Sequence, residues 1–370
     1  MKPLKILAGI LVLFSFSNSI AQVQDNDTVK LDIRKILSFA LDADIASALN
    51  VLEADSTKLL SEQNKKLKTE FENRFKFGED KSTYLNDREK YGISELLKIY
   101  ANYWRVSLLN NKNNYDTLLG TSLFLFFRNK YSLTDFYVAD SLQSDTLDYF
   151  LKIYINESGL MTTGFGKTGK LLDLLAWKNQ KDSVFKFNLL DEELKVKVVL
   201  MTDFATLGWE EYATLGTYYP GGWATDDALY CVKDAYDLNS ETFLVSYLAH
   251  ESRHFSDYKL FDKKLSGAEL EYRAKLTELS LAKKSVQYLI SFFLANANYE
   301  SDNSHNIADY CVIRDLSKIL FKIDLEKDTK KWESIDAEKI NEASKSVLKE
   351  NTEFLKKNGK DFKHFIPKGY

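Results

Sequence analysis

Apolar residues recur every three to four positions along most of the chain, which is the period of amphipathic helices. In the first half this pattern is clearest at residues 31–41, 96–104 and 118–126. A polar turn cluster, Asn110–Asn114, separates two of these segments. We therefore expect a helical region over residues 22–180.

The period changes in the middle of the chain. Runs of β-branched and aromatic residues at 184–187 and 196–200 predict strands, joined by a polar hairpin at Asp191–Glu193. Residues 228–236 predict a further strand. The helical period returns at Ser240 and continues almost to the C-terminus.

Together these patterns predict an α+β fold that is mostly helical, with a small mixed or antiparallel sheet. The predicted parts are a targeting segment at residues 1–21, the helical region at 22–180, a domain containing the sheet at 181–355, and a Lys-rich tail at 356–370. We expect the tail to be poorly ordered, because terminal segments that nothing ties down commonly are.

The composition is that of a globular protein, with 45% hydrophobic and 28% charged residues. The chain has 50 Lys and Arg residues against 54 Asp and Glu residues, which gives a formal net charge of −4. Proteins that bind nucleic acid usually carry an excess of basic residues. We therefore expect no nucleic-acid partner.

The first residues are typical of a secretory signal peptide. Lys2 and Lys5 flank the start of an apolar run, Ile6–Phe16, and Ser19–Ala21 supplies the small residues of a cleavage site. This run is shorter than the roughly 20 residues that a membrane-spanning helix needs, and so are the later apolar runs. We therefore expect cleavage near Ala21, no stable membrane insertion, and an exported protein that is periplasmic or secreted.

Export leaves two interpretations of the two cysteines. In an oxidising compartment Cys231 and Cys311 can form an intramolecular disulfide. Each can equally be a separate buried thiol, because free cysteine packs like a small apolar residue. The sequence alone leaves both interpretations open.

The segment most informative about chemistry is His250–His254, which reads His-Glu-Ser-Arg-His. Only 4 histidines occur in the chain, and two of them lie in this HExxH pattern. We expect Ser240 to cap the helix that carries it. The four-residue spacing places both imidazoles on one helix face, where they can bind one zinc ion. Glu251 can then act as the general base on a water molecule.

The motif resembles that of the HExxH zinc metallopeptidases. Asp257 and Leu260 stand where the metzincin pattern has a glycine and its third ligand, which excludes that group. The gluzincin pattern takes its third ligand from a glutamate on a second helix downstream, and the sequence starting at Glu271 is similar to its E-x-x-A form. The resemblance implies a zincin-like domain in which His250, His254 and Glu271 bind zinc.

Two other acids are alternative third ligands. Glu278 lies two turns beyond Glu271 on the same predicted helix. Glu269 fits a capping box with Ser266, in which the two residues bond each other's backbone amides, and this gives Glu269 a structural role.

Asp257 is too far along its helix to bind the same ion as His250 and His254. We expect it to pair with Arg253 or Arg273, to support a ligand, or to lie on the surface as an ordinary acid. His364, in the Lys-rich tail, receives no role.

Further site residues follow from the resemblance. Thermolysin-like enzymes stabilise the oxyanion with a downstream His or Tyr, so we expect His305 to be catalytic and Tyr310 to contact the substrate. Zincins also place an antiparallel edge strand beside the metal, where it pairs with an extended peptide. Residues 228–236, with Tyr230, are the candidate strand, and Gly222 permits close backbone approach at the cleft.

The sequence therefore predicts an exported zinc metallopeptidase that hydrolyses a peptide or protein substrate, with Glu251 as general base. Two alternatives stay open. One is a non-catalytic zincin-like module that binds a partner or has a structural role, and the other is a zinc hydrolase of a non-peptide substrate. A fourth protein ligand would indicate a structural site, whereas an open position would indicate an enzyme.

Overall fold

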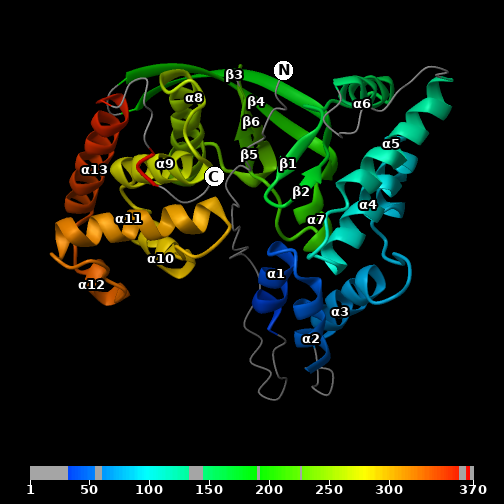
Figure 1. The fold of residues 1–370 in the computed structure, drawn as a ribbon, viewed down its shortest axis with the longest axis horizontal. Helices are drawn as coiled ribbons and strands as arrows, with labels where there is room; N and C mark the ends of the chain where they lie inside the picture. Colours follow the sequence, from blue (N-terminus) through cyan, green and yellow to red (C-terminus); the bar gives the residue numbers. More distant parts are fainter. Residues whose placement is uncertain are drawn as a thin grey trace. The chain divides into compact units, whose positions relative to one another are not determined.

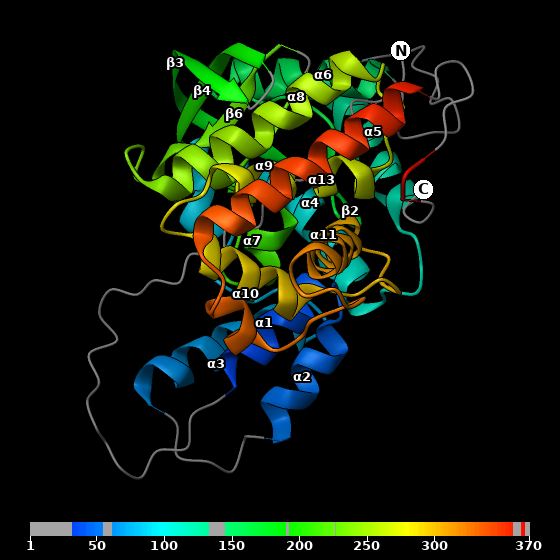
Figure 2. The same cartoon turned by 90° about the vertical axis from the view of Figure 1, so that its left-hand side faces the viewer.

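Figures 1 and 2 show the computed structural model, which describes residues 32–54, 61–132, 145–189, 192–225, 227–357 and 364–366. These residues form an α+β structure that is mostly helical, as the sequence predicts. They divide into two compact units, one comprising residues up to Gln180 with Met201–Pro220, the other Lys181–Leu200 with Gly221–Tyr370. The predicted signal peptide lies outside the described residues.

The first unit is largely helical. In α4 (Ser94–Leu109) the apolar positions Leu96, Leu97, Tyr100 and Trp104 are all buried, which confirms the period seen in the sequence. Asp32 caps the first helix by accepting a hydrogen bond from the Lys35 amide. The other helical segments of this unit are α1 (Ile33–Leu41), α2 (Ile45–Ala54), α3 (Glu62–Phe75), η1 (Asn86–Tyr91), α5 (Asp116–Tyr131), α6 (Asp145–Glu157) and α7 (Trp209–Ala213).

Strands begin earlier than the sequence analysis predicts. Two short strands, β1 (Gly166–Thr168) and β2 (Leu171–Asp173), pair antiparallel inside the region expected to be helical. The two predicted strands are confirmed as parts of long strands, β3 (Leu175–Leu189) and β4 (Glu192–Leu207). In β4, exposed Lys195 and Lys197 alternate with buried valines, which is the two-residue period of a half-buried strand.

The larger sheet has the strand order β3-β4-β6-β5. Strand β6 (Leu229–Val232) lies between β4 and β5 (Gly222–Ala224), so the two edge strands of this sheet are β3 and β5. The sequence analysis expected residues 228–236 to be the edge strand, which is wrong. The strand is shorter than predicted because the 3₁₀ turn η2 (Lys233–Ala235) ends it, and its outer neighbour is β5.

The HExxH segment starts helix α8 (His250–Leu260), which continues directly from the π-helical segment η3 (Thr242–Ala249). The Ser240 hydroxyl accepts a hydrogen bond from the Phe243 amide at 3.1 Å, as expected of a capping residue. The His250 amide bonds the carbonyl of Val245, five residues back, so the turns before the motif are wider than those of the expected α-helix.

Helix α9 (Gly267–Leu281) is the central element of the second unit. It packs against α8, α11 (Ser304–Leu320) and α13 (Ala337–Lys357), and both views show it among them (Figures 1 and 2). Every residue from Ala268 to Ser280 is buried. The remaining helices of this unit are α10 (Val286–Asn296) and α12 (Thr329–Glu333).

The N-terminus of α9 carries the predicted capping box. The Ser266 hydroxyl accepts a hydrogen bond from the Glu269 amide, and the Glu269 carboxylate accepts one from the Ser266 amide at 3.0 Å. The same carboxylate lies 2.6 Å from Nδ1 of His364 and accepts the amide of Phe365. This part of the tail is therefore held on α9, contrary to the expectation of disorder, and His364 has a structural contact.

A buried ion pair joins α8 to α9. Arg273 donates from Nε and Nη2 to the two oxygens of Asp257, at 2.7 and 2.9 Å, and both side chains are fully buried. Of the two predicted partners of Asp257, Arg273 makes this close bidentate contact, whereas Nη1 of Arg253 lies 3.9 Å from Oδ1 of Asp257. Arg273 also donates to Asn351 and Thr352 of α13.

The cysteines do not form the disulfide that one interpretation of the sequence expected. Cys231 in β6 and Cys311 in α11 are both buried free thiols. Burial raises the pKa of Cys231 to about 12 and that of Cys311 to about 11, so both are neutral near pH 7 and pack as small apolar residues.

Among the described residues, no helix combines the length and the apolar character needed to cross a membrane.

We expect Asp257→Ala to lower the free energy of unfolding of the metal-free protein by about 3–5 kcal/mol, because Arg273 would remain charged and buried without its partner. Chemical denaturation measures this. The matched control is Glu53→Ala, in an exposed ion pair with Lys76, which should change the value by less than about 0.5 kcal/mol. Equal effects of the two variants would contradict the prediction.

Candidate metal centre

The two motif histidines lie side by side on α8. Nε2 of His250 and Nε2 of His254 are 3.0 Å apart, and the side chains are almost fully buried. One helical turn separates the residues, so both rings face α9 from the same side of α8.

Glu271 of α9 completes this group. Its carboxylate oxygens lie 3.3 Å from Nε2 of His250 and 3.4 Å from Nε2 of His254. The three side chains each offer a donor atom within 4.8 Å of the others, an arrangement that can hold a metal ion. Of the three acids that the sequence left open as third ligand, Glu271 is the one that the structure brings to both histidines.

Glu278 lies behind His250 instead. Its Oε1 atom is 2.7 Å from Nδ1 of His250, on the side of the ring opposite to Glu271. A carboxylate at Nδ1 fixes the proton on that nitrogen and leaves Nε2 as the metal donor. Glu278, the alternative third ligand, therefore orients the His250 ring. Glu269, the third acid, is used in the capping box.

The charges of the group are strongly coupled. Burial alone would lower the pKa of His250, but its close interactions with the carboxylates of Glu271 and Glu278 outweigh this and raise the pKa to about 10. Burial would likewise raise the pKa of Glu271, but the nearby His305, His254 and His250 hold it well below its usual value. The carboxylates of Glu271 and Glu278 therefore favour a positive charge at this group.

Several polar atoms in this group have no hydrogen-bond partner. They are both carboxylate oxygens of Glu271, Oε1 of Glu251 and Nδ1 of His254. Unpaired buried polar atoms are rare and costly in proteins. A cation between the histidines and Glu271 would satisfy the Glu271 oxygens, and two imidazoles with one carboxylate are a donor set that zinc favours. The residues therefore fit a divalent metal.

Glu251 follows the first ligand and points into the same buried region. Its side chain is 1% exposed, and burial raises its pKa. Since Oε1 of Glu251 makes no hydrogen bond to any described residue, this oxygen is available for a proton.

His305 and Tyr310 both lie on α11 but have different surroundings. Nδ1 of His305 is 3.0 Å from Oε2 of Glu271, and its side chain is 28% exposed. The Tyr310 ring packs on Tyr299 with centroids 5.3 Å apart. The structure thus brings His305 to the predicted ligands and Tyr310 to a hydrophobic cluster of the second unit.

The two substrate-binding candidates on the sheet also have structural contacts. Gly222 and Tyr230 lie on the paired strands β5 and β6. A Cβ atom on Gly222 would lie 2.4 Å from the Tyr247 ring and 2.3 Å from the Tyr230 carbonyl oxygen. The close approach that Gly222 permits is therefore made by Tyr247. The Tyr230 ring stacks on Trp223 at 5.4 Å.

The sequence analysis missed a second buried pair near the ligands. Nζ of Lys275 lies 2.9 Å from Oδ1 of Asp309, joining α9 to α11. Lys275 is one turn after Glu271, and Asp309 is one turn after His305. This pair therefore fixes the two helices that bring His305 to Glu271. One signal in the sequence could have identified this pair: a lysine, Lys275, shares a helix face with Glu271 and Glu278.

Comparison of the chain with models of protein families, with curated proteins and with solved structures finds no match.

We expect about one divalent metal ion per chain in protein purified with added zinc, and its loss in His254→Ala, because two protein donors hold zinc far less well than three. Elemental analysis of dialysed protein measures this. His364→Ala removes a histidine outside the group and should keep the metal. Equal metal content in the two variants would exclude this site.

Glu278→Ala should weaken zinc binding about 10–100-fold, because the His250 ring would lose the carboxylate that orients it. Competition with a chromogenic chelator measures the affinity. The control is Glu342→Ala, an exposed acid on α13. Affinities within twofold of each other would show that Glu278 does not support the site.

Proposed function

We propose that the chain is an exported, zinc-dependent metallopeptidase of the gluzincin type, with His250, His254 and Glu271 as ligands. The observation that carries this proposal is the buried group of three donors with Glu251 beside it. Among the described residues the group contains three protein donors. Three donors with an open position are typical of catalytic zinc, whereas structural zinc usually has four.

Zinc bound in such a site polarises a carbonyl group and makes a water molecule more acidic. Glu251 takes a proton from that water and later delivers it to the leaving amine. Its raised pKa brings it closer to neutral pH, where a carboxyl group can both accept and release a proton. His305 lies at the exposed side of the group and donates a hydrogen bond to the oxyanion.

The sheet supports a peptide as substrate. Strand β5 is at the edge of the sheet and packs against α8, the helix that carries Glu251. An edge strand has unpaired backbone groups that an extended peptide can bond. The three residues of β5 are themselves buried, so the choice of peptide bonds over other hydrolysable bonds rests on the resemblance of the motif to the metallopeptidases.

We expect Glu251→Gln to lower kcat for peptide hydrolysis about 10²–10⁴-fold with zinc content unchanged, because the amide cannot accept the proton. A mixed peptide library analysed by mass spectrometry, together with ester and amide substrates, measures activity. The matched control is Glu342→Gln. Full activity in Glu251→Gln would contradict the mechanism. Stoichiometric zinc without hydrolysis of any substrate by the wild type would indicate a non-catalytic module.

A further inference from the structure

Tyr247 lies one turn before Glu251 on the continuous helix that η3 and α8 form. Side chains four positions apart share a helix face, so the phenol and the Glu251 carboxylate project to the same side. The segment that carries Tyr247 is π-helical, a rare geometry that occurs frequently at functional sites. This turn of the helix therefore brings a second polar group to the face of the general base.

Three neighbours hold the Tyr247 ring in place. It stacks on Phe243 with ring centroids 5.5 Å apart, and it packs against Tyr236 at 5.2 Å. On the side of the sheet, a Cβ atom on Gly222 would lie 2.4 Å from the ring, so a glycine at this position of β5 makes room for it. Packing therefore fixes the position of the Tyr247 hydroxyl.

The hydroxyl of this tightly packed ring has no hydrogen-bond partner among the described residues. Tyr247 is fully buried. The Cys231 thiol interacts with the phenol, but a thiol is a weak acceptor. A buried hydroxyl without a partner lowers stability, and a phenylalanine would avoid that cost. Such a group calls for an explanation, and function is one that applies beside a predicted general base.

Oε1 of Glu251 is the matching acceptor. It is buried and also has no hydrogen-bond partner among the described residues. Burial raises the pKa of the Tyr247 phenol well above its usual value, and the nearby charge of Glu251 adds to this effect. The phenol is therefore near Glu251 and remains protonated at neutral pH. A buried water molecule commonly joins polar groups of this kind, because it can accept from one and donate to the other.

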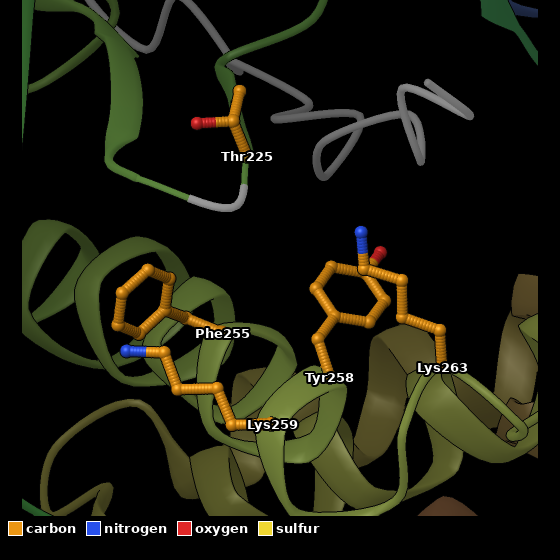
Figure 3. Close-up of a pocket in the computed structure, with 5 residues that line it drawn as sticks. All are labelled: Thr225, Phe255, Tyr258, Lys259 and Lys263. Atoms are coloured by element: carbon orange, nitrogen blue, oxygen red, sulfur yellow. The ribbon is translucent and has the colours of Figure 1, made fainter. Parts of the chain in front are cut away.

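Glu251 separates Tyr247 from a cavity further along α8. The cavity has a volume of about 210 Å³ and is lined by Thr225, Phe255, Tyr258, Lys259 and Lys263 (Figure 3). Phe255 is one turn and Tyr258 two turns after Glu251. Substrate groups thus have room on this side of Glu251, whereas the fully buried phenol on the other side suits a partner as small as water.

We propose that Tyr247 is a further catalytic residue, whose hydroxyl binds the water molecule that Glu251 deprotonates. The proposal rests on the metallopeptidase function proposed above. The phenol donates its hydrogen to the water oxygen, which turns one water proton toward Oε1 of Glu251. That proton passes to Oε1 as the O–H bond breaks, and the freed electron pair forms the bond to the substrate carbonyl carbon. The phenol keeps its own proton and stabilises the charge that develops on the oxygen.

Tyr247→Phe removes the hydroxyl and leaves the ring in its packing. We expect kcat for peptide hydrolysis to fall about 10²-fold, with KM and zinc content unchanged. The melting temperature should not fall, because the lost hydroxyl had no partner. The matched control is Tyr103→Phe in α4, a buried tyrosine whose hydroxyl donates to Asp116 at 2.7 Å. It should melt at a lower temperature and keep the wild-type kcat.

A double variant tests whether the phenol acts on the same water as Glu251. In a Glu251→Gln background, Tyr247→Phe should lower kcat by less than about twofold more, because two groups that act on one molecule are not additive. A further loss as large as that in the wild-type background would overturn the proposal. Wild-type kcat in Tyr247→Phe, or a loss of kcat accompanied by a lower melting temperature, would also overturn it.

Crystallography provides a measurement that does not depend on activity. In the purified wild type we expect an ordered water molecule about 2.6–3.2 Å from both the Tyr247 hydroxyl and Oε1 of Glu251, and we expect it to be lost in Tyr247→Phe. A wild-type structure without this water, or a variant that keeps it, would contradict the assignment. Failure of the wild type to hydrolyse any substrate would overturn the peptidase function, while the two crystal structures would still decide whether Tyr247 and Glu251 share a water molecule.

Discussion

Helix α9 carries charged side chains that are buried away from water, and these charges must be paired. Besides Glu269 of the capping box, its charged residues Glu271, Arg273, Lys275 and Glu278 are all buried. A buried charge is costly unless it is paired and hydrogen-bonded, so each must find a partner on a neighbouring helix. Arg273 finds Asp257 on α8, Lys275 finds Asp309 on α11, and Glu278 finds His250. These pairs allow α9 to be buried inside the unit. They also hold α8, the helix that carries the HExxH motif, against Glu271.

The parts that the sequence predicted well depend on local spacing. The helices at 96–104 and after Ser240, the capping box at Ser266 and the shared face of His250 and His254 involve residues three or four positions apart. The preference for Glu271 also had a local basis, because Glu269 was already used by the capping box. Such signals lie within a few turns of chain and can be identified without knowledge of the fold.

The parts that it missed depend on contacts between distant segments. Which strand lies at the edge is decided by the pairing of β6 with β4, and whether the cysteines of β6 and α11 meet, which the sequence left open, is likewise decided by packing. The position of Glu278 behind the His250 ring depends on how α8 and α9 cross. The spacing of residues along the sequence places an acid on one face of a helix. Only tertiary packing decides whether that acid meets both histidines, as Glu271 does, or the far side of one ring, as Glu278 does.

The contacts of Glu269 have a consequence for the order in which the chain assembles. Its carboxylate binds His364 and Phe365, 95 and 96 residues later in the sequence, and α9 carries Glu271 two residues beyond it. During synthesis, α8 and α9 emerge long before these partners exist. Contacts so distant in sequence form late in folding. The first turn of α9, which precedes Glu271, therefore gains its full set of hydrogen bonds only after nearly the whole chain has been made.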